Sequence, residues 1–383
     1  MGISIAFMIV ALVVGVFRLM AQNGVGPVEL SQLYALHPLF MVFGFLAGII
    51  MTERIAGVEL LPSSSKTWLV SVMPPLIFAG ILTETAGYLY DSALARYDGA
   101  SLLVIASLLF MVLLSSFYKK GRGNTPVIFM LISAFALLAS SVLSASSLPA
   151  GNVGFVMLLL SFPVVFVLGE RADLTSVATR TTSDRFLPAL FFSGASVFLF
   201  SVGAFVPSSA SDPAWLVAFA LLGAAFAVIM VAERRAVSRQ TTSPFQQYVS
   251  RHVGLAYAWG LEGAAFGIAY LLSPLFAFYD AFIHSLALGF IGLMLLAHGP
   301  IVLPTVLRKE FDNARLSYAP LSLLSLAIAL RIGAELVLLQ AFSSAVEFLV
   351  AASGWLVLAA VLAFFVEIIR GVGFHERANL EPA

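Results

Sequence analysis

The chain has 383 residues, of which 61% are hydrophobic and only 10% are charged, against roughly a quarter charged in an ordinary soluble domain. With a mean hydropathy of +1.02, this composition excludes a water-soluble globule and indicates a multi-pass membrane protein. The absence of cysteine excludes disulfides, thiolate-held iron–sulfur clusters and a cysteine nucleophile. Twenty basic residues balance twenty acidic ones without a basic cluster, so we expect no nucleic-acid partner.

Twelve apolar segments, each close to the roughly 20 residues that a helix needs to cross a bilayer, follow one another along the chain. They cover approximately residues 3–21, 33–51, 67–88, 100–118, 125–146, 152–169, 186–206, 214–232, 252–272, 281–303, 317–340 and 346–369. The first segment lacks the basic start and the cleavage site of a signal peptide, so we expect it to remain as a helix. The sequence therefore predicts an all-α polytopic bundle of about twelve transmembrane helices. Because the loops are short, residues 1–383 are expected to form a single integral membrane domain.

The positions of the lysines and arginines predict the orientation of the bundle. Of these 20 residues, 17 lie in loops after the even-numbered segments, Arg18 and Arg96 lie on the opposite side, and Arg331 lies inside a segment. The positive-inside rule therefore predicts that both termini are cytoplasmic and that the protein is a multi-pass component of the cytoplasmic (inner) membrane. The lipid bilayer is its first expected partner.

Four of the five histidines lie within or at the ends of the predicted segments. They are His37 and His284 on the predicted outer side and His252 and His298 on the cytoplasmic side, while His375 lies in the tail. His284 and His298 project from nearly one helix face, about 21 Å apart along the axis. This spacing suits two stacked haems, because neutral imidazole binds haem iron strongly and neighbouring helices would supply the opposite axial ligands. His37 would then complete an outer site with His284, and His252 an inner site with His298.

Several glycines follow these histidines at helical spacing, and we expect them to leave room for a flat macrocycle. They are Gly44, Gly48, Gly260, Gly263, Gly267, Gly289 and Gly292. The alternative is that they serve helix packing, as glycine commonly does in membranes. Ligation is favoured for His37 and His284, whereas the helix is expected to loosen after His298 at Gly299 and Pro300. An interfacial role is favoured for His252, which follows a charged residue.

Charged residues inside a bilayer are functional candidates by default because they are expensive unless paired. Arg331 and Glu335 lie at positions i and i+4, so they either neutralise each other or leave Arg331 to hold a haem propionate. Glu262 lies in mid-bilayer without a helical partner and is expected to be a protonated structural carboxyl or part of a proton path. Three further carboxylates are predicted to be solvated at the membrane boundaries, namely Glu84, Glu347 and Glu367.

Three short stretches resemble sequence motifs of the NnrS-like proteins. The stretch from His37 to Thr52 resembles their second helix, in which a histidine precedes a Met-x-Phe-Gly-Phe run. The stretch from Arg251 to Trp259 resembles their His-x-x-Tyr-Ala-Trp segment, and that from Phe282 to Met294 their His-Ala-x-x-x-Gly-x-x-Gly-x-Met helix. Together they cover 38 of the 383 residues, about a tenth of the chain, in short apolar motifs. NnrS-like proteins are membrane haem proteins tied to nitric-oxide metabolism and are distantly similar to the catalytic subunit of haem–copper oxidases.

The resemblance implies ligand roles for His37 and His284 and a weaker one for His252, and it implies none for His298. The sequence departs from the family pattern at Leu39, where NnrS-like proteins usually have a second histidine, and in the spacing from His252 to Tyr257, which is longer than in the family motif. No three histidines share one depth to hold copper beside a haem. Oxygen reduction at a haem–copper centre is therefore disfavoured.

These observations predict an integral membrane haem-b protein that binds one or two haems and either transfers electrons or binds a diatomic gas such as nitric oxide. The candidate cofactor-binding residues are His37, His284, His298, His252 and Arg331. Other respiratory or nitrogen-oxide-handling membrane subunits are the partners that this function implies, and whether the protein is an enzyme stays open. The alternatives are a proton-coupled secondary transporter that uses Arg331, Glu335 and Glu262, and a membrane-anchor subunit of a respiratory complex.

Overall fold

The computed structural model describes residues 2–22, 36–59, 67–118, 125–145, 153–179, 183–205, 213–237, 243–307, 316–338 and 344–371. Helices make up nearly all of these residues, and none of them forms a strand. Eleven helices among them are long and apolar enough to cross a membrane. The predicted all-α polytopic bundle is confirmed.

The helices follow the predicted segments in order. The first half comprises α1 (Gly2–Gln22), α3 (His37–Leu39), η2 (Phe40–Ala47), α4 (Gly48–Glu59), α5 (Thr67–Leu89), α6 (Ala93–Tyr118), α7 (Thr125–Ser144), α8 (Val153–Thr179), η4 (Ser183–Phe186) and α9 (Leu187–Phe205). The second half comprises α10 (Pro213–Val237), α11 (Pro244–Leu272), α12 (Phe276–His284), η5 (Ser285–Gly292), α13 (Leu293–Leu307), α14 (Ala319–Leu338) and α15 (Ser344–Gly371). The elements α3, η2 and α4 form one unbroken helix at the predicted second segment, as α12, η5 and α13 do at the tenth.

The hydropathy predicted that the ninth segment starts at residue 252. In the structure, the corresponding helix α11 begins earlier, at Pro244. Ser243 explains the earlier start, because its side chain accepts a hydrogen bond from the Gln246 backbone N–H at 3.1 Å and its backbone N–H donates one to the Gln246 side-chain oxygen at 3.2 Å. Such a capping box starts a helix in polar sequence that a hydropathy window overlooks. Helix α13 continues to Leu307 through Pro300, so the expected loosening there is wrong.

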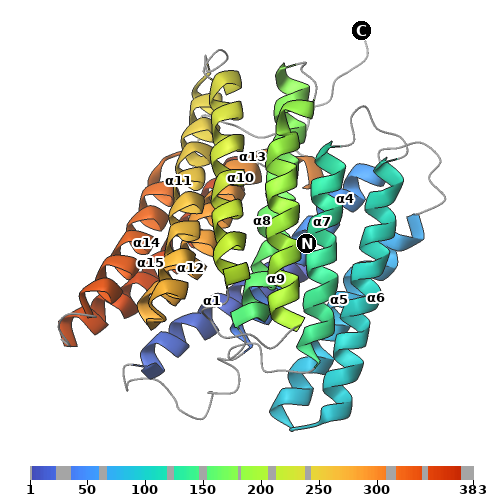
Figure 1. The fold of residues 1–383 in the computed structure, drawn as a ribbon, viewed down its shortest axis with the longest axis horizontal. Helices are drawn as coiled ribbons and strands as arrows, with labels where there is room; N and C mark the ends of the chain where they lie inside the picture. The colour runs from blue at the N-terminus through green and yellow to red at the C-terminus, as the bar shows by residue number, and fades with distance from the viewer. Residues whose placement is uncertain are drawn as a thin grey trace.

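Most helices stand side by side, with α8 near the middle and α5, α6 and α7 grouped at one end of the bundle (Figure 1). From Val153 to Leu168, helix α8 is apolar on all sides, which is typical of a helix enclosed by others, and most of its side chains are buried. Helix α1 runs obliquely beneath this array (Figure 1). It lies against η2 and α15, where its Ser4 faces Gly48 and its Val16 faces Gly354.

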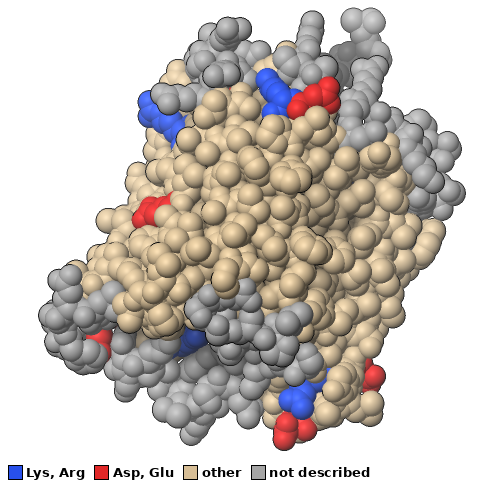
Figure 2. All heavy atoms as spheres, viewed as in Figure 1, with Lys and Arg blue, Asp and Glu red and all other residues tan. Residues whose placement is uncertain are grey.

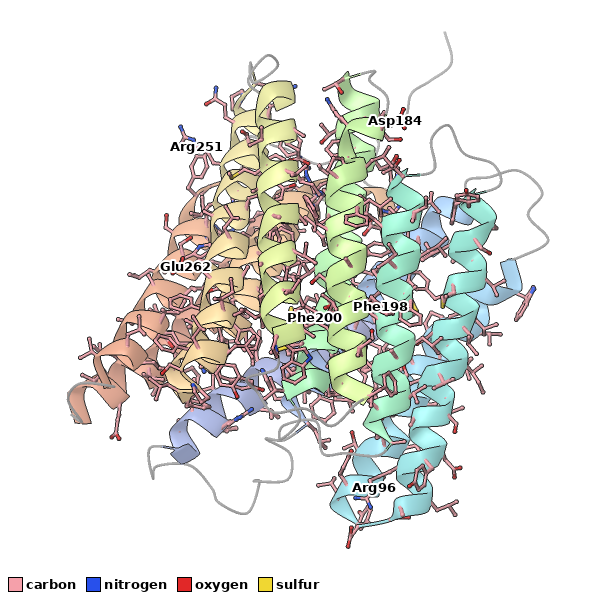
Figure 3. The ribbon with its side chains drawn as sticks, in the orientation of Figure 1. Arg96, Asp184, Phe198, Phe200, Arg251 and Glu262 are labelled. Carbon is pink, nitrogen blue, oxygen red and sulfur yellow. The ribbon has the colours of Figure 1, made fainter. Side chains whose placement is uncertain are left out.

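Charged side chains gather at two opposite ends of the face shown in Figure 2, apart from one acidic group midway. Arg251 and Asp184 lie at one end and Arg96 at the other (Figure 3). We call these the cytoplasmic end and the outer end, following the predicted orientation. Most of the lysines and arginines behind that prediction, and His375 as well, lie outside the described residues.

The glycines that were expected to leave room for a macrocycle are instead covered by neighbouring side chains. A Cβ added at Gly44 would lie 2.7 Å from the Phe7 ring, and one at Gly289 would lie 2.5 Å from the Trp259 Cβ. The same close packing holds for Gly48 under Ser4, Gly260 under Phe226, Gly263 under Leu286 and Gly267 under Phe219. Of these glycines, only Gly292 also lines a cavity, and a Cβ added there would lie 3.2 Å from the Leu324 side chain. These glycines are therefore explained by close packing between helices, which was the alternative to room for a macrocycle.

Candidate functional site

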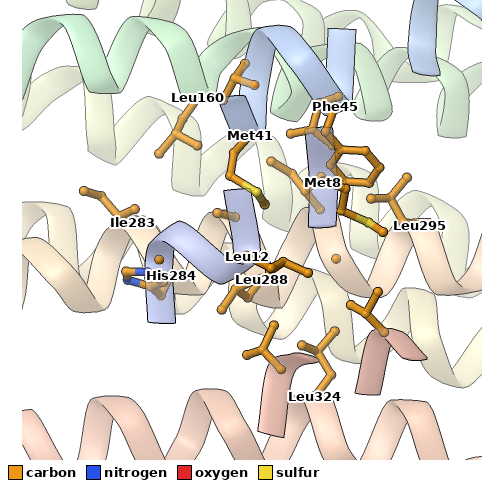
Figure 4. Close-up of a pocket in the computed structure, with 18 of the residues that line it drawn as sticks. Met8, Leu12, Met41, Phe45, Leu160, Ile283, His284, Leu288, Leu295 and Leu324 are labelled. Carbon is orange, nitrogen blue, oxygen red and sulfur yellow. The ribbon is translucent and has the colours of Figure 1, made fainter. Parts of the chain in front are cut away.

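A cavity of about 280 Å³ lies between α1, the helix from α3 to α4, α8, the helix from α12 to α13, α14 and α15. We call it the central cavity. Its walls are mainly Leu, Ile, Val, Met and Phe side chains, and Figure 4 shows Met8, Leu12, Met41 and Leu288 lining it. The few polar residues lie toward its two ends. They are Arg18, His37, Asp280, His284 and Arg331 at the outer end, and Glu53, Glu170 and His298 at the cytoplasmic end.

His37 is held against α1 at the outer end of the cavity. Its Nδ1 donates a hydrogen bond to the Ala11 carbonyl at 2.8 Å. Gly15 lies against the same ring, so closely that an added Cβ would lie 2.8 Å from the imidazole Cε1. Because a carbonyl can only accept, this bond places the proton on Nδ1 and leaves the Nε2 lone pair available to a ligand.

His284 ends α12 and is oriented by two groups of Asp280, one turn earlier. Its Nδ1 lies 2.9 Å from the Asp280 carbonyl and 3.1 Å from the Asp280 Oδ2. The guanidinium of Arg331 binds the same carboxylate at both oxygens, with Nε at 2.5 Å and Nη2 at 2.8 Å. A carboxylate behind a histidine is the usual support of a metal-ligating imidazole, since it fixes the tautomer and raises the basicity of Nε2.

Asp280 is the main partner of Arg331, and the sequence analysis overlooked it. Glu335, the predicted partner, lies 3.8 Å from the Arg331 Nε, and its own Oε2 is buried without a hydrogen bond to any described residue. The spacing of Asp280 and His284 at i and i+4 could have revealed Asp280 as a partner of His284, but no spacing within one helix reveals its contact with Arg331. Arg331 is therefore neutralised across two helices rather than mainly within its own.

His298 lines the cytoplasmic end of the cavity, where a second buried ion pair lies beside it. Arg171 binds Glu233 at both oxygens, at 3.1 and 3.0 Å, and Thr175 donates to the same carboxylate at 3.0 Å. The His298 Nδ1 donates to a carbonyl of its own helix at 2.7 Å, and its Nε2 lies 3.5 Å from the Arg171 Nη1. The guanidinium thus approaches the nitrogen that a metal would need, and sequence reasoning missed both members of the pair.

A family model described as "Domain of unknown function (DUF8744)" matches residues 2–372. The chain belongs to this family. No curated protein matches it. The DUF8744 match includes every helix that lines the central cavity.

His252 of the DUF8744 domain lies away from the central cavity. It is fully buried rather than interfacial, and its ring centroid lies 4.0 Å from that of Tyr248. Its Nδ1 donates to the Tyr248 carbonyl at 2.8 Å, and its Nε2 has no hydrogen bond to a described residue. His298 lines the cavity and His252 does not, so the structure does not bring the predicted inner pair to one site.

A π-helical stretch begins three residues after His37 and directly after His284. These are η2 after the short helix that starts at His37 and η5 after His284. Stretches of π-helix are rare and occur frequently at functional sites. Their positions in this DUF8744 chain single out the same two residues that the cavity brings together.

Glu262 lies midway along α11 and outside the central cavity (Figure 3). Its side chain is half-buried, so it does not join Arg331 and Glu335 in one polar site. Within the described part of the DUF8744 domain, no group of three or more His, Asp and Glu residues could hold a metal ion. The central cavity offers a metal-containing group a pair of imidazoles, those of His37 and His284.

Proposed function

We propose that the protein is a haem-b protein of the cytoplasmic membrane, which binds one haem in the central cavity through His37 and His284 and serves in electron transfer. One observation carries the proposal. Two imidazoles from helices far apart in the sequence line the same apolar cavity, each with Nδ1 hydrogen-bonded to a carbonyl. No described residue forms a hydrogen bond with Nε2 of either ring.

The walls and the ends of the cavity fit a haem. Its volume of about 280 Å³ is just under the roughly 300–1,000 Å³ of ligand pockets. Met8, Met41 and Leu288 occupy its middle (Figure 4), and methionine is a flexible side chain that repacks readily around an inserted group. Arg18 and Arg331 at the outer end provide guanidinium groups for two carboxylates. Acidic residues at the cytoplasmic end disfavour carboxylates there.

The residues around the central cavity would hold the haem rather than react with it. When bound, the haem supplies reversible one-electron chemistry at its iron. His37 and His284 would together hold the haem, and a pair of imidazoles suits electron transfer. Asp280 and Arg331 hold His284 in place from behind. Ala11 does the same for His37, so both rings are oriented before any ligand arrives.

The likeness to NnrS-like proteins supports a haem, and with it a role beside nitrogen-oxide-handling or respiratory membrane subunits. The surroundings of His298 and His252 favour one haem over two. Arg171 approaches the Nε2 of the first, and the second is packed against Tyr248 outside the cavity. A carrier built on Arg331, Glu335 and Glu262 is disfavoured because Arg331 lines the central cavity, whereas Glu335 and Glu262 do not.

The test is the visible spectrum and the haem stoichiometry of the protein, expressed with sufficient haem and purified in detergent. We expect about one haem per chain with a Soret band typical of two imidazole ligands, unchanged by nitric oxide. His37→Ala and His284→Ala should each abolish that spectrum, and His252→Ala is the matched control that should keep it. A colourless wild-type protein contradicts the proposal, and a spectrum that nitric oxide shifts contradicts the electron-transfer role.

A further inference from the structure

Glu84 of α5 lies in a second polar site, outside the central cavity, among α5, α6 and α7. The residue is fully buried, although the sequence had predicted a solvated carboxylate at the membrane boundary. No described residue forms a hydrogen bond with its Oε1. Its Oε2 accepts from the Ser144 hydroxyl at 3.5 Å, which is long for a bond to a carboxylate. The neighbouring Thr85 hydroxyl is buried without a partner as well.

No basic side chain neutralises Glu84 among the described residues. Tyr88, one turn along α5, is the titratable group nearest in sequence. Arg96 of α6 stacks over the Tyr88 ring at 5.4 Å and lies 3.8 Å from Asp91, and it forms no ion pair with Glu84. Helix α7 presents serines here, and η2, which also packs on α5, carries no titratable side chain. Helix α4 carries its charged residues Glu53 and Arg54 toward the cytoplasmic end, where Arg54 pairs with Glu170.

Helices α5 and α6 pack closely beside Glu84. A Cβ added at Gly99 would lie 2.7 Å from the Glu84 Cβ and equally close to the Gly80 carbonyl oxygen. An ionised carboxylate that is buried without a cation is strongly disfavoured, and it takes up a proton instead. The free Oε1 is the atom that would carry this proton.

Buried hydroxyl groups extend from Glu84 along the same helix interface. Ser144 contacts Glu84, the Tyr88 hydroxyl donates to the Ser144 carbonyl at 3.0 Å, and the Ser141 and Ser107 hydroxyls lie 3.1 Å apart one turn deeper. Arg96 marks the outer end of the same helices (Figure 3). The Ser144 hydroxyl contacts Glu84 and can both donate and accept, so it can pass a proton between the carboxyl and water that enters from the outer end.

We propose that Glu84 is a proton-binding site, filled and emptied from the outer end through the Tyr88 and Ser144 region. The proton comes from outer water, binds Oε1 to give a neutral carboxyl, and returns to water when it is released. The site shares no residue with the central cavity. It therefore does not depend on the haem proposal.

The test is labelling of the full-length protein in liposomes with dicyclohexylcarbodiimide, an apolar reagent that reacts with protonated carboxyls in membranes. Peptide mass spectrometry should find the adduct on Glu84, decreasing as the pH rises and unaffected by sodium ions. Infrared spectroscopy of the wild-type protein should show the carbonyl band of a neutral carboxyl, shifted in heavy water and lost in Glu84→Gln. Glu347→Gln, at the start of α15, is the matched control that should keep that band.

Two results would overturn the proposal. Protection of Glu84 by sodium or lithium ions would show that the site takes a metal cation rather than a proton. Absence of both the adduct and the neutral carboxyl band in the folded wild-type protein would show that Glu84 is ionised. Both measurements use the wild-type chain, so they stand even where Glu84→Gln fails to fold. Neither depends on haem content.

Discussion

Replacement of Gly15 by alanine tests whether α1 positions His37 as a ligand. The new Cβ would lie 2.8 Å from the His37 Cε1 and 3.1 Å from its Nδ1. Comfortable contact between two carbon atoms begins at about 3.5 Å. The ring therefore has to move by about 0.7 Å, the difference between these two distances. This movement disturbs the 2.8 Å hydrogen bond to Ala11 and moves Nε2 with it.

Loss of a group that orients a metal-ligating histidine typically lowers metal affinity by about 10- to 100-fold. We expect Gly15→Ala to weaken haem binding by this factor, measured by titrating haem-depleted protein and following the Soret band. Gly254→Ala is the control, because nothing lies within 4 Å of a Cβ added there. Haem affinity in Gly15→Ala equal to that of Gly254→Ala, with both proteins folded, would refute the reasoning that His37 is a pre-oriented ligand.

Three further changes probe the surroundings of the site. Asp280→Asn leaves the Arg331 guanidinium buried beside a neutral amide, and we expect a loss of about 3–5 kcal/mol in unfolding free energy, measured by denaturation in detergent. An unchanged stability would contradict the buried pair. Gly267→Ala forces the Phe219 ring aside and should cost about 1–3 kcal/mol in the same assay without changing the haem spectrum. His252→Phe should keep full haem content, measured as the haemochrome, because the residue lies outside the cavity. Loss of haem in this variant would indicate that His252 is a haem ligand.

Hydropathy and the distribution of charge were sufficient to predict the class of fold, because crossing a bilayer imposes a length and a composition on each helix. Helix ends were predicted less well. The start of α11 depends on the capping box at Ser243, and that of α12 at Phe276 lies among residues that a hydropathy window treats as a loop. The hydrogen bonds of a capping box leave little trace in average hydropathy.

The contents of the candidate site were only partly predictable. Depth alone grouped His37 with His284, and the structure places both along one cavity. Depth also grouped His298 with His252, and there it failed, because the side from which a residue leaves its helix depends on which neighbours pack there. The pairing of Arg171 with Glu233 likewise joins α8 to α10, and no spacing within one helix could reveal it.

The two π-helical stretches carry a consequence for how this chain can change. A π-turn accommodates one residue more than an α-turn, and each residue of an α-helix turns it by about 100°. Shortening Phe40–Ala47 or Ser285–Gly292 by a single residue would restore regular winding and swing the preceding histidine by about this angle around its axis. Deletion of one residue would thus turn an imidazole away from the central cavity while the walls from the other helices keep their residues, so these two stretches are natural points at which relatives would gain or lose the proposed haem.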